Sequence, residues 1–191
     1  GDAAVLDEEA YAERMRALAR RYPRDADIAT LAAEAILNLH PYDWWAQDGS
    51  ARPWTAEIRT LLTRALAIAP GHPGANHYWV HLMESSAHPE HAQASAEQLK
   101  RLVPGSGHLT HMPAHIQMRM GRYAEAVAAN ERAIAADERY IAQVDAQGAY
   151  RVGYVAHNRH FLWAAAAMDG RSATALAAAR VLRAHPGPRR G

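Results

Sequence analysis

The chain has 191 residues, of which 49% are apolar, 12 are histidine and none is cysteine, and its formal net charge is +1. This charge balance gives no electrostatic reason to expect a nucleic acid or a membrane surface as a partner, and no apolar run approaches the roughly 18 residues of a membrane span. Without cysteine, disulfides and thiolate metal sites are excluded.

Alanine, the best helix former, dominates the apolar fraction, and small side chains let helices pack closely, so the sequence predicts an all-helical fold. The predicted helices span residues 7–22, 27–39, 55–69, 75–86, 88–102, 109–120, 123–144, 154–169 and 172–184. Insertions are expected near residues 40–53 and 139–153, and residues 185–191 are expected to form a disordered tail. Residues 1–184 would then form one domain. The aromatic residues of the first insertion suit either a lid over the mouth of a binding groove or a hydrophobic plug between neighbouring repeats.

The sequence repeats with a period of about 34 residues. Pro70 and Pro104, which each close an apolar helix, are one such period apart. The block GRYAEA, which begins at Gly121, recurs as GRSATA from Gly170, at a longer offset that equals one period plus an insertion. This period, together with a small residue at the inter-helix turn and a closing proline, resembles the tetratricopeptide repeat over most of the chain.

This resemblance implies an α-solenoid of about three to four antiparallel helical hairpins, whose first helices line a concave groove. Residues 7–22 then correspond to an unpaired second helix, which suggests a fragment or processed form of a longer protein. No secretory segment is visible at the start, which slightly favours the cytoplasm. Because the chain begins with Gly1 and not with methionine, export with removal of a signal segment also stays open.

Seven of the twelve histidines follow the repeat: two pairs are one period apart, and two pairs are separated by the longer offset of the glycine blocks. Spacings of three and four residues place each set on one face of a helix, and equivalent positions on stacked repeats are neighbours. We therefore expect these side chains to converge in the groove. They are His77, His81, His108, His111, His115, His157 and His160.

Converging imidazoles favour a transition-metal site, since neutral imidazole is the commonest metal ligand and a buried polar group without a partner costs about 1–3 kcal/mol. Nitrogen ligands with one carboxylate suit copper or zinc, less well iron, and argue against calcium and magnesium. Seven histidines exceed the four ligands of a tetrahedral ion, so either some act as outer partners or there are two ions. Glu84, three residues after His81, is the one carboxylate that we nominate as a catalytic base or ligand.

Three classes of function stay open. The first is a metal-binding protein, which includes a histidine-ligated oxidoreductase or hydrolase. The second is an interaction scaffold that holds a peptide or small molecule in the groove without metal, and the third is a polar network with a structural role. The zinc-protease, nucleophile-elbow and phosphate-loop motifs are missing, so the sequence does not decide whether the protein is an enzyme.

Overall fold

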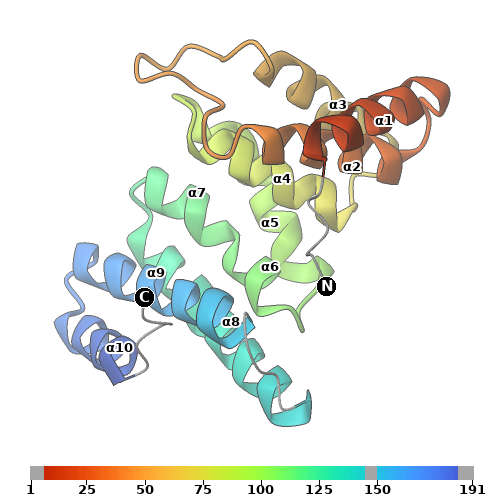
Figure 1. The fold of residues 1–191 in the computed structure, drawn as a ribbon. Helices are drawn as coiled ribbons and strands as arrows, with labels where there is room; N and C mark the ends of the chain where they lie inside the picture. Colours follow the sequence, from red (N-terminus) through yellow and green to blue (C-terminus); the bar gives the residue numbers. More distant parts are fainter. Residues whose placement is uncertain (1–6, 145–149, 185–191) are drawn as a thin grey trace. The chain divides into compact units, whose positions relative to one another are not determined.

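The computed structural model describes residues 7–144 and 150–184 (Figure 1). Every regular element in these residues is a helix, which confirms the predicted all-helical fold; an isolated β-bridge joins Trp45 and Ala51 within a loop. No helix in this part of the chain is long and apolar enough to cross a membrane. The predicted tail lies outside the described residues, as does part of the second predicted insertion.

The chain divides into two compact units, Gly1–His88 and Pro89–Gly191, and each is described by itself. The helices of the described part of unit 1 are α1 (Glu8–Arg21), α2 (Ala26–Leu39), α3 (Thr55–Ile68) and α4 (Pro73–Glu84). Their beginnings follow from capping side chains: Asp7 accepts a hydrogen bond from the backbone of α1, Asp25 from that of α2, and His72 from that of α4. The predicted boundaries of these helices are confirmed to within two residues.

Small residues let the helices of unit 1 approach closely. Ala29 of α2, Ala65 of α3 and Ala75 of α4 are fully buried and belong to one core cluster. Alanine is also the strongest helix former, so the same residue type favours both the helices and their close packing.

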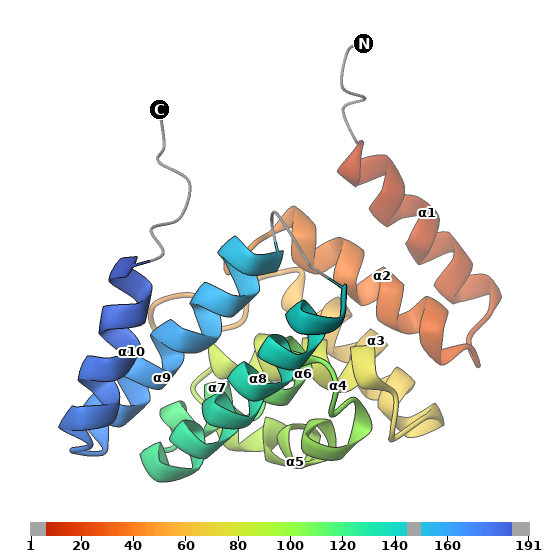
Figure 2. The same ribbon diagram turned by 90° about the horizontal axis from the view of Figure 1, so that it is seen from below.

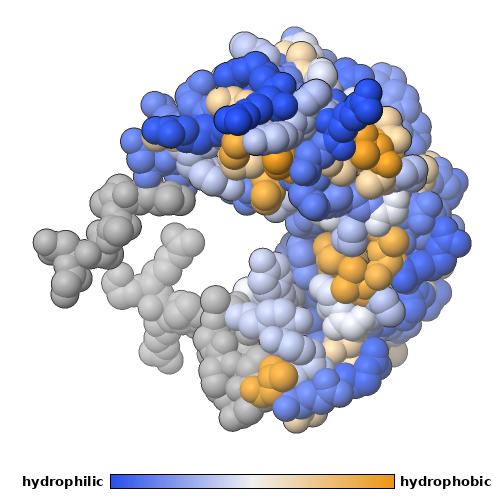
Figure 3. Space-filling model, turned by 90° about the vertical axis from the view of Figure 1, so that its right-hand side faces the viewer, coloured by the Kyte–Doolittle hydropathy of each residue, from blue (hydrophilic) through white to orange (hydrophobic). Residues whose placement is uncertain are grey.

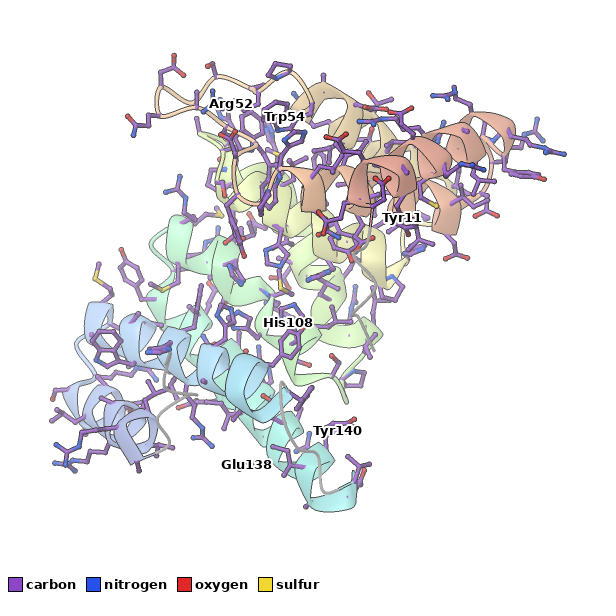
Figure 4. All side chains as sticks on the ribbon, in the orientation of Figure 1. Tyr11, Arg52, Trp54, His108, Glu138 and Tyr140 are labelled. Carbon is purple, nitrogen blue, oxygen red and sulfur yellow. The ribbon has the colours of Figure 1, made fainter. Side chains whose placement is uncertain are left out.

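The insertion between α2 and α3 is the long orange loop of Figure 1, in which Figure 4 labels Arg52 and Trp54. Trp44 is buried in the core, and its carbonyl accepts a hydrogen bond from the Thr55 hydroxyl. The indole of Trp45 donates to the carbonyl of Leu82, at 2.7 Å. These contacts favour the plug over the lid, since the Trp44 side chain is buried, the Trp44 carbonyl fastens the loop to α3 and the Trp45 indole fastens it to α4.

Unit 2 contains two short helical turns and six α-helices in the residues that the structure describes. In chain order these elements are a 3-10 turn (Pro89–Ala92), α5 (Gln93–Leu102), α6 (Gly107–His111), α7 (Pro113–Arg119), α8 (Tyr123–Val144), a π-helical turn (Tyr150–Val155), α9 (Ala156–Met168) and α10 (Ser172–Ala184). Helix α9 packs against both α8 and α10 (Figure 2). An alanine-rich cluster that includes Ala126, Ala129 and Ala165 forms the core between them.

The two copies of the repeated block form the turns between α7 and α8 and between α9 and α10. Gly121 and Gly170 have φ values of +71° and +75°, the left-handed region that glycine adopts without strain. The repeated glycine therefore has a structural cause, since it ends one helix and lets the chain reverse into the next.

The prediction of a single helix over residues 109–120 is wrong in one respect, because α6 ends at His111 and α7 begins at Pro113. Proline has no N–H to continue the helical ladder. The interruption is slight: Met112, between the two helices, keeps helical φ and ψ of −48° and −36°. His111 and His115 therefore still follow one another at nearly helical spacing.

The face drawn in Figure 3 is mostly hydrophilic, with separate hydrophobic patches. Exposed apolar residues in small groups are normal for a folded chain.

Candidate metal centre

Three histidines of unit 2 bring their ring nitrogens together. His111 ends α6, His115 lies in α7 and His157 lies in the first turn of α9. One nitrogen from each ring lies within 4.8 Å of the other two. His111 is fully buried, His115 is 5% exposed and His157 is half-buried. Three imidazoles at this separation can reach one ion after small side-chain movements, since zinc–nitrogen bonds are about 2.0–2.1 Å long.

Hydrogen bonds determine which nitrogen of His111 faces its neighbours. Asn130 of α8 donates from Nδ2 to the carbonyl of Ala126, at 2.8 Å, so its Oδ1 is the atom that lies 2.7 Å from His111 Nδ1. Nδ1 must therefore carry the proton, which leaves the lone pair on Nε2. That Nε2 lies 2.9 Å from Nε2 of His115, which is the donor of this second hydrogen bond. His111 thus presents a ligand nitrogen toward the cluster.

The cluster keeps His111 neutral. Burial, and after it the nearby imidazoles of His115 and His157, hold the pKa of His111 well below its usual value of 6.5, although the hydrogen bond with Asn130 opposes this shift. Metal ligation requires the neutral imidazole, so burial and crowding select the protonation state that an ion needs.

An apolar wall closes one side of the three histidines. The ring of Phe161, the only phenylalanine of the chain, lies 4.7 Å from His111, 4.5 Å from His115 and 5.0 Å from His157, measured between ring centroids. Phe161 in turn packs against the alanine-rich core of unit 2. Such a wall lowers the local dielectric and strengthens electrostatic bonding between a ligand nitrogen and a cation.

A buried carboxylate braces the helices that carry these histidines. Asp137 of α8 is fully buried and accepts hydrogen bonds from Asn158 Nδ2 and from the Tyr150 hydroxyl, both at 2.7 Å. Asn158 directly follows His157, so this bond holds the start of α9 against α8. A side chain at Gly107, the first residue of α6, would place its Cβ 1.8 Å from Asp137 Oδ1. Desolvation and the Asp137 carboxylate raise the pKa of the Tyr150 phenol, which therefore stays a donor.

The other two predicted ligands of unit 2 lie outside this group of three. His108 is half-buried on α6 (Figure 4), with its ring 6.2 Å from His111 and 4.7 Å from Tyr154. His160 is exposed on α9, 6.5 Å from the ring of Trp163. No group of three or more possible ligands among the described residues includes His160.

The remaining predicted residues lie on α4 in unit 1. The rings of His77 and His81 are 4.7 Å apart and nearly perpendicular. Glu84, the residue nominated as base or ligand, ends α4, and its Oε1 lies 2.7 Å from His81 Nδ1. Glu84 therefore lies about one helical turn after His81 on the same helix and contacts that histidine.

Asn130, Asp137 and Phe161 were not among the residues predicted for the site. A signal for two of them exists in the sequence: Asn130 and Asp137 are seven residues apart on the buried, alanine-rich face of α8. A polar residue on such a face needs a buried partner. The partners are His111 for Asn130 and Asn158 for Asp137, which lie 19 and 21 residues away in the chain. Helical periodicity does not predict contacts between residues so far apart.

No protein-family model, no curated protein and no solved structure matches the chain. The tetratricopeptide resemblance therefore remains an inference from the repeat pattern, and the geometry of the three histidines is what indicates a function.

Proposed function

We propose that unit 2 binds one transition-metal ion, copper or zinc, through His111, His115 and His157. The observation that carries this proposal is the convergence of three ring nitrogens within 4.8 Å of one another in a buried setting. The hydrogen bond from His111 to Asn130 supports it, because metal-bound histidines usually donate their other N–H to a fixed acceptor.

The ligand set argues for copper or zinc over iron. Three imidazoles suit both metals, whereas mononuclear non-haem iron usually takes two histidines and a carboxylate. Both oxygens of Asp137 already accept hydrogen bonds, which disfavours it as the missing carboxylate. Two nitrogens on one tetrahedral ion are about 3.3 Å apart. The Nε2 atoms of His111 and His115, 2.9 Å apart, therefore need to separate only slightly to bind one ion, and the proton that His115 donates between them must leave that position.

A site with three protein ligands keeps a fourth position for water or substrate. The half-buried His157 offers the solvent-facing side of the cluster, since His111 and His115 are buried. Such a site permits oxidoreductase chemistry with copper or hydrolysis with zinc. We propose that any catalytic role rests on the bound ion and on its open fourth position.

We also propose that the chain is a histidine-rich tetratricopeptide-like protein whose hairpins stack as a solenoid. The support is local. Helices α7–α8 and α9–α10 each form a pair of consecutive, contacting helices joined by a short glycine turn, and both turns belong to the repeated block. The sequence period of about 34 residues agrees with that family.

The alternative function is an interaction scaffold that works without metal. It is favoured by large apolar side chains that are exposed on α9 and α10, namely Trp163 at 46%, Met168 at 59% and Leu176 at 56%. Exposed apolar groups of this size can mark a partner surface. The two functions predict opposite effects of histidine substitutions on the metal content of the protein.

Metal analysis of the full chain, purified without a histidine tag, tests the proposal. We expect His111→Ala/His115→Ala to lose one equivalent of copper or zinc relative to the unmodified chain. His160→Ala is the matched control, because it removes an exposed histidine of the helix that carries His157, and it should keep the full metal content. An unchanged metal content in the double variant would refute the proposed centre and favour the scaffold.

A further inference from the structure

Helix α4 carries a histidine pair with the same internal geometry as the pair in unit 2. His77 and His81 have ring centroids 4.7 Å apart and an interplanar angle of 77°, while His111 and His115 have 4.7 Å and 74°. The two pairs lie one period of the sequence repeat apart. Residues at i and i+4 on a helix lie on one face, so both pairs can act as a two-nitrogen clamp.

A carboxylate orients one ring of this pair. Glu84 Oε1 lies 2.7 Å from His81 Nδ1, and each of the two side chains is 15% exposed. The contact places the proton of His81 on Nδ1 when the ring is neutral, so that Nε2 keeps its lone pair. A carboxylate that holds a histidine in this way is the usual outer partner of a metal-bound imidazole.

The loop beside α4 is strained at one residue. Tyr42 has φ of +58°, and within the described residues it is the one non-glycine residue with positive φ. Desolvation, and after it the negative charge of Glu84, raise the pKa of Tyr42. The indole of Trp45 fastens this loop to Leu82, two residues before Glu84. Strain that the surrounding structure maintains is concentrated at ligand sites in proteins.

We propose that His77 and His81 form a second metal site, held by unit 1 alone, which takes a divalent copper ion through two imidazoles while Glu84 positions His81. Water completes the coordination. Copper is the fitting ion because its affinity for nitrogen ligands is the highest among the divalent first-row metals and its square-planar geometry accommodates two neighbouring imidazoles. We expect this site to bind more weakly than the centre of unit 2, where three imidazoles converge.

The test is a calorimetric titration of the full chain with Cu(II), with three variants beside the unmodified protein. We expect two ions for the unmodified chain, one for His77→Ala/His81→Ala, one for His111→Ala/His115→Ala and none when all four histidines are replaced. Alanine favours helix, so the variants of α4 should keep their secondary structure, which circular dichroism checks.

The variant Glu84→Gln removes no ligand and separates a metal site from a merely structural pair. We expect it to weaken the second Cu(II) site by about 10–100-fold and to leave the tighter site unchanged. Two ions retained by His77→Ala/His81→Ala, loss of both ions from it, or a Glu84→Gln titration identical to that of the unmodified chain would overturn this inference. The proposed function is judged separately, by the His111→Ala/His115→Ala variant.

Discussion

The Oδ1 atom of Asn130 accepts a hydrogen bond from His111 Nδ1 at 2.7 Å and thereby connects α8 to the end of α6. Because both residues are fully buried, water cannot replace either partner. The bond fixes the ring orientation of His111 and directs its Nε2 toward His115. The long helix α8 is thus the scaffold that positions the candidate centre.

Replacing Asn130 tests this positioning role. Asn130→Ala leaves the His111 N–H without its acceptor, so we expect a loss of about 1–3 kcal/mol in the free energy of unfolding. Metal affinity should fall by about 10–100-fold. Asn130→Asp keeps the acceptor oxygen and should retain most of the metal affinity. Equal affinities for the alanine variant and the unmodified protein would show that Asn130 does not orient the ligand.

Gly107 has no room for a side chain, since a Cβ there would lie 1.8 Å from Asp137 Oδ1. Gly107→Ala should therefore displace the carboxylate or the start of α6, and overpacking of this kind costs about 1–3 kcal/mol. Gly105 is the matched control, because no atom lies within 4 Å of a Cβ at that position. Thermal unfolding of both variants checks the prediction, and equal melting temperatures would contradict the brace that we assign to Asp137.

The metal-free protein should lose stability as the pH falls below about 6.5. The folded chain holds the pKa of His111 well below 6.5, whereas the unfolded chain has the ordinary value. Between these two values the unfolded state binds one more proton at His111. The free energy of unfolding therefore decreases as the pH is lowered, by at most about 1.4 kcal/mol per pH unit from this group. Above pH 6.5 the contribution is fully present.

Chemical denaturation at a series of pH values, with His111→Phe for comparison, measures that contribution. The phenylalanine variant cannot take up the proton, so its stability should depend less steeply on pH between about 5 and 6.5. If the two proteins have the same slope, His111 is not the titrating group. The comparison needs metal-free protein, because a bound ion would add its own pH dependence.

The sequence predicts the helices well because capping residues and prolines mark their ends. It also predicts the pairing of histidines within α4 and across the α6–α7 junction, since helical spacing decides which residues share a face. The ring separation of 4.7 Å in both pairs agrees with that expectation.

The third histidine of the cluster shows where the repeat register fails. The offset between the two glycine blocks equates His160 with His111, yet the residue that meets His111 is His157, while His160 is exposed. An offset across an insertion does not fix how the next helix is rotated about its axis. Here α9 follows a π-helical turn, which changes the number of residues per turn. That rotation depends on tertiary packing, including the bond from Asn158 to Asp137.

Chelation should loosen a defined part of unit 2. An ion that binds only the folded state stabilises it by about 2.7 kcal/mol at a hundredfold excess over its Kd. Hydrogen exchange with and without a chelator should therefore change in α6, α7 and the first turns of α9, which carry the three histidines. Helices α1 to α3 carry no histidine and should change little. Equal protection of unit 2 in both conditions would favour the scaffold without metal.

X-ray absorption at the metal edge counts the imidazole ligands and so tests the central claim most directly. The sample is the full chain with His77→Ala/His81→Ala, loaded with one equivalent of zinc, so that α4 contributes no histidine. We predict three imidazole nitrogens at about 2.0–2.1 Å and one further light-atom ligand. In the same sample with His111→Ala/His115→Ala added, the imidazole signal should disappear or fall to one ring. A first sample with fewer than three imidazoles would contradict the proposed centre.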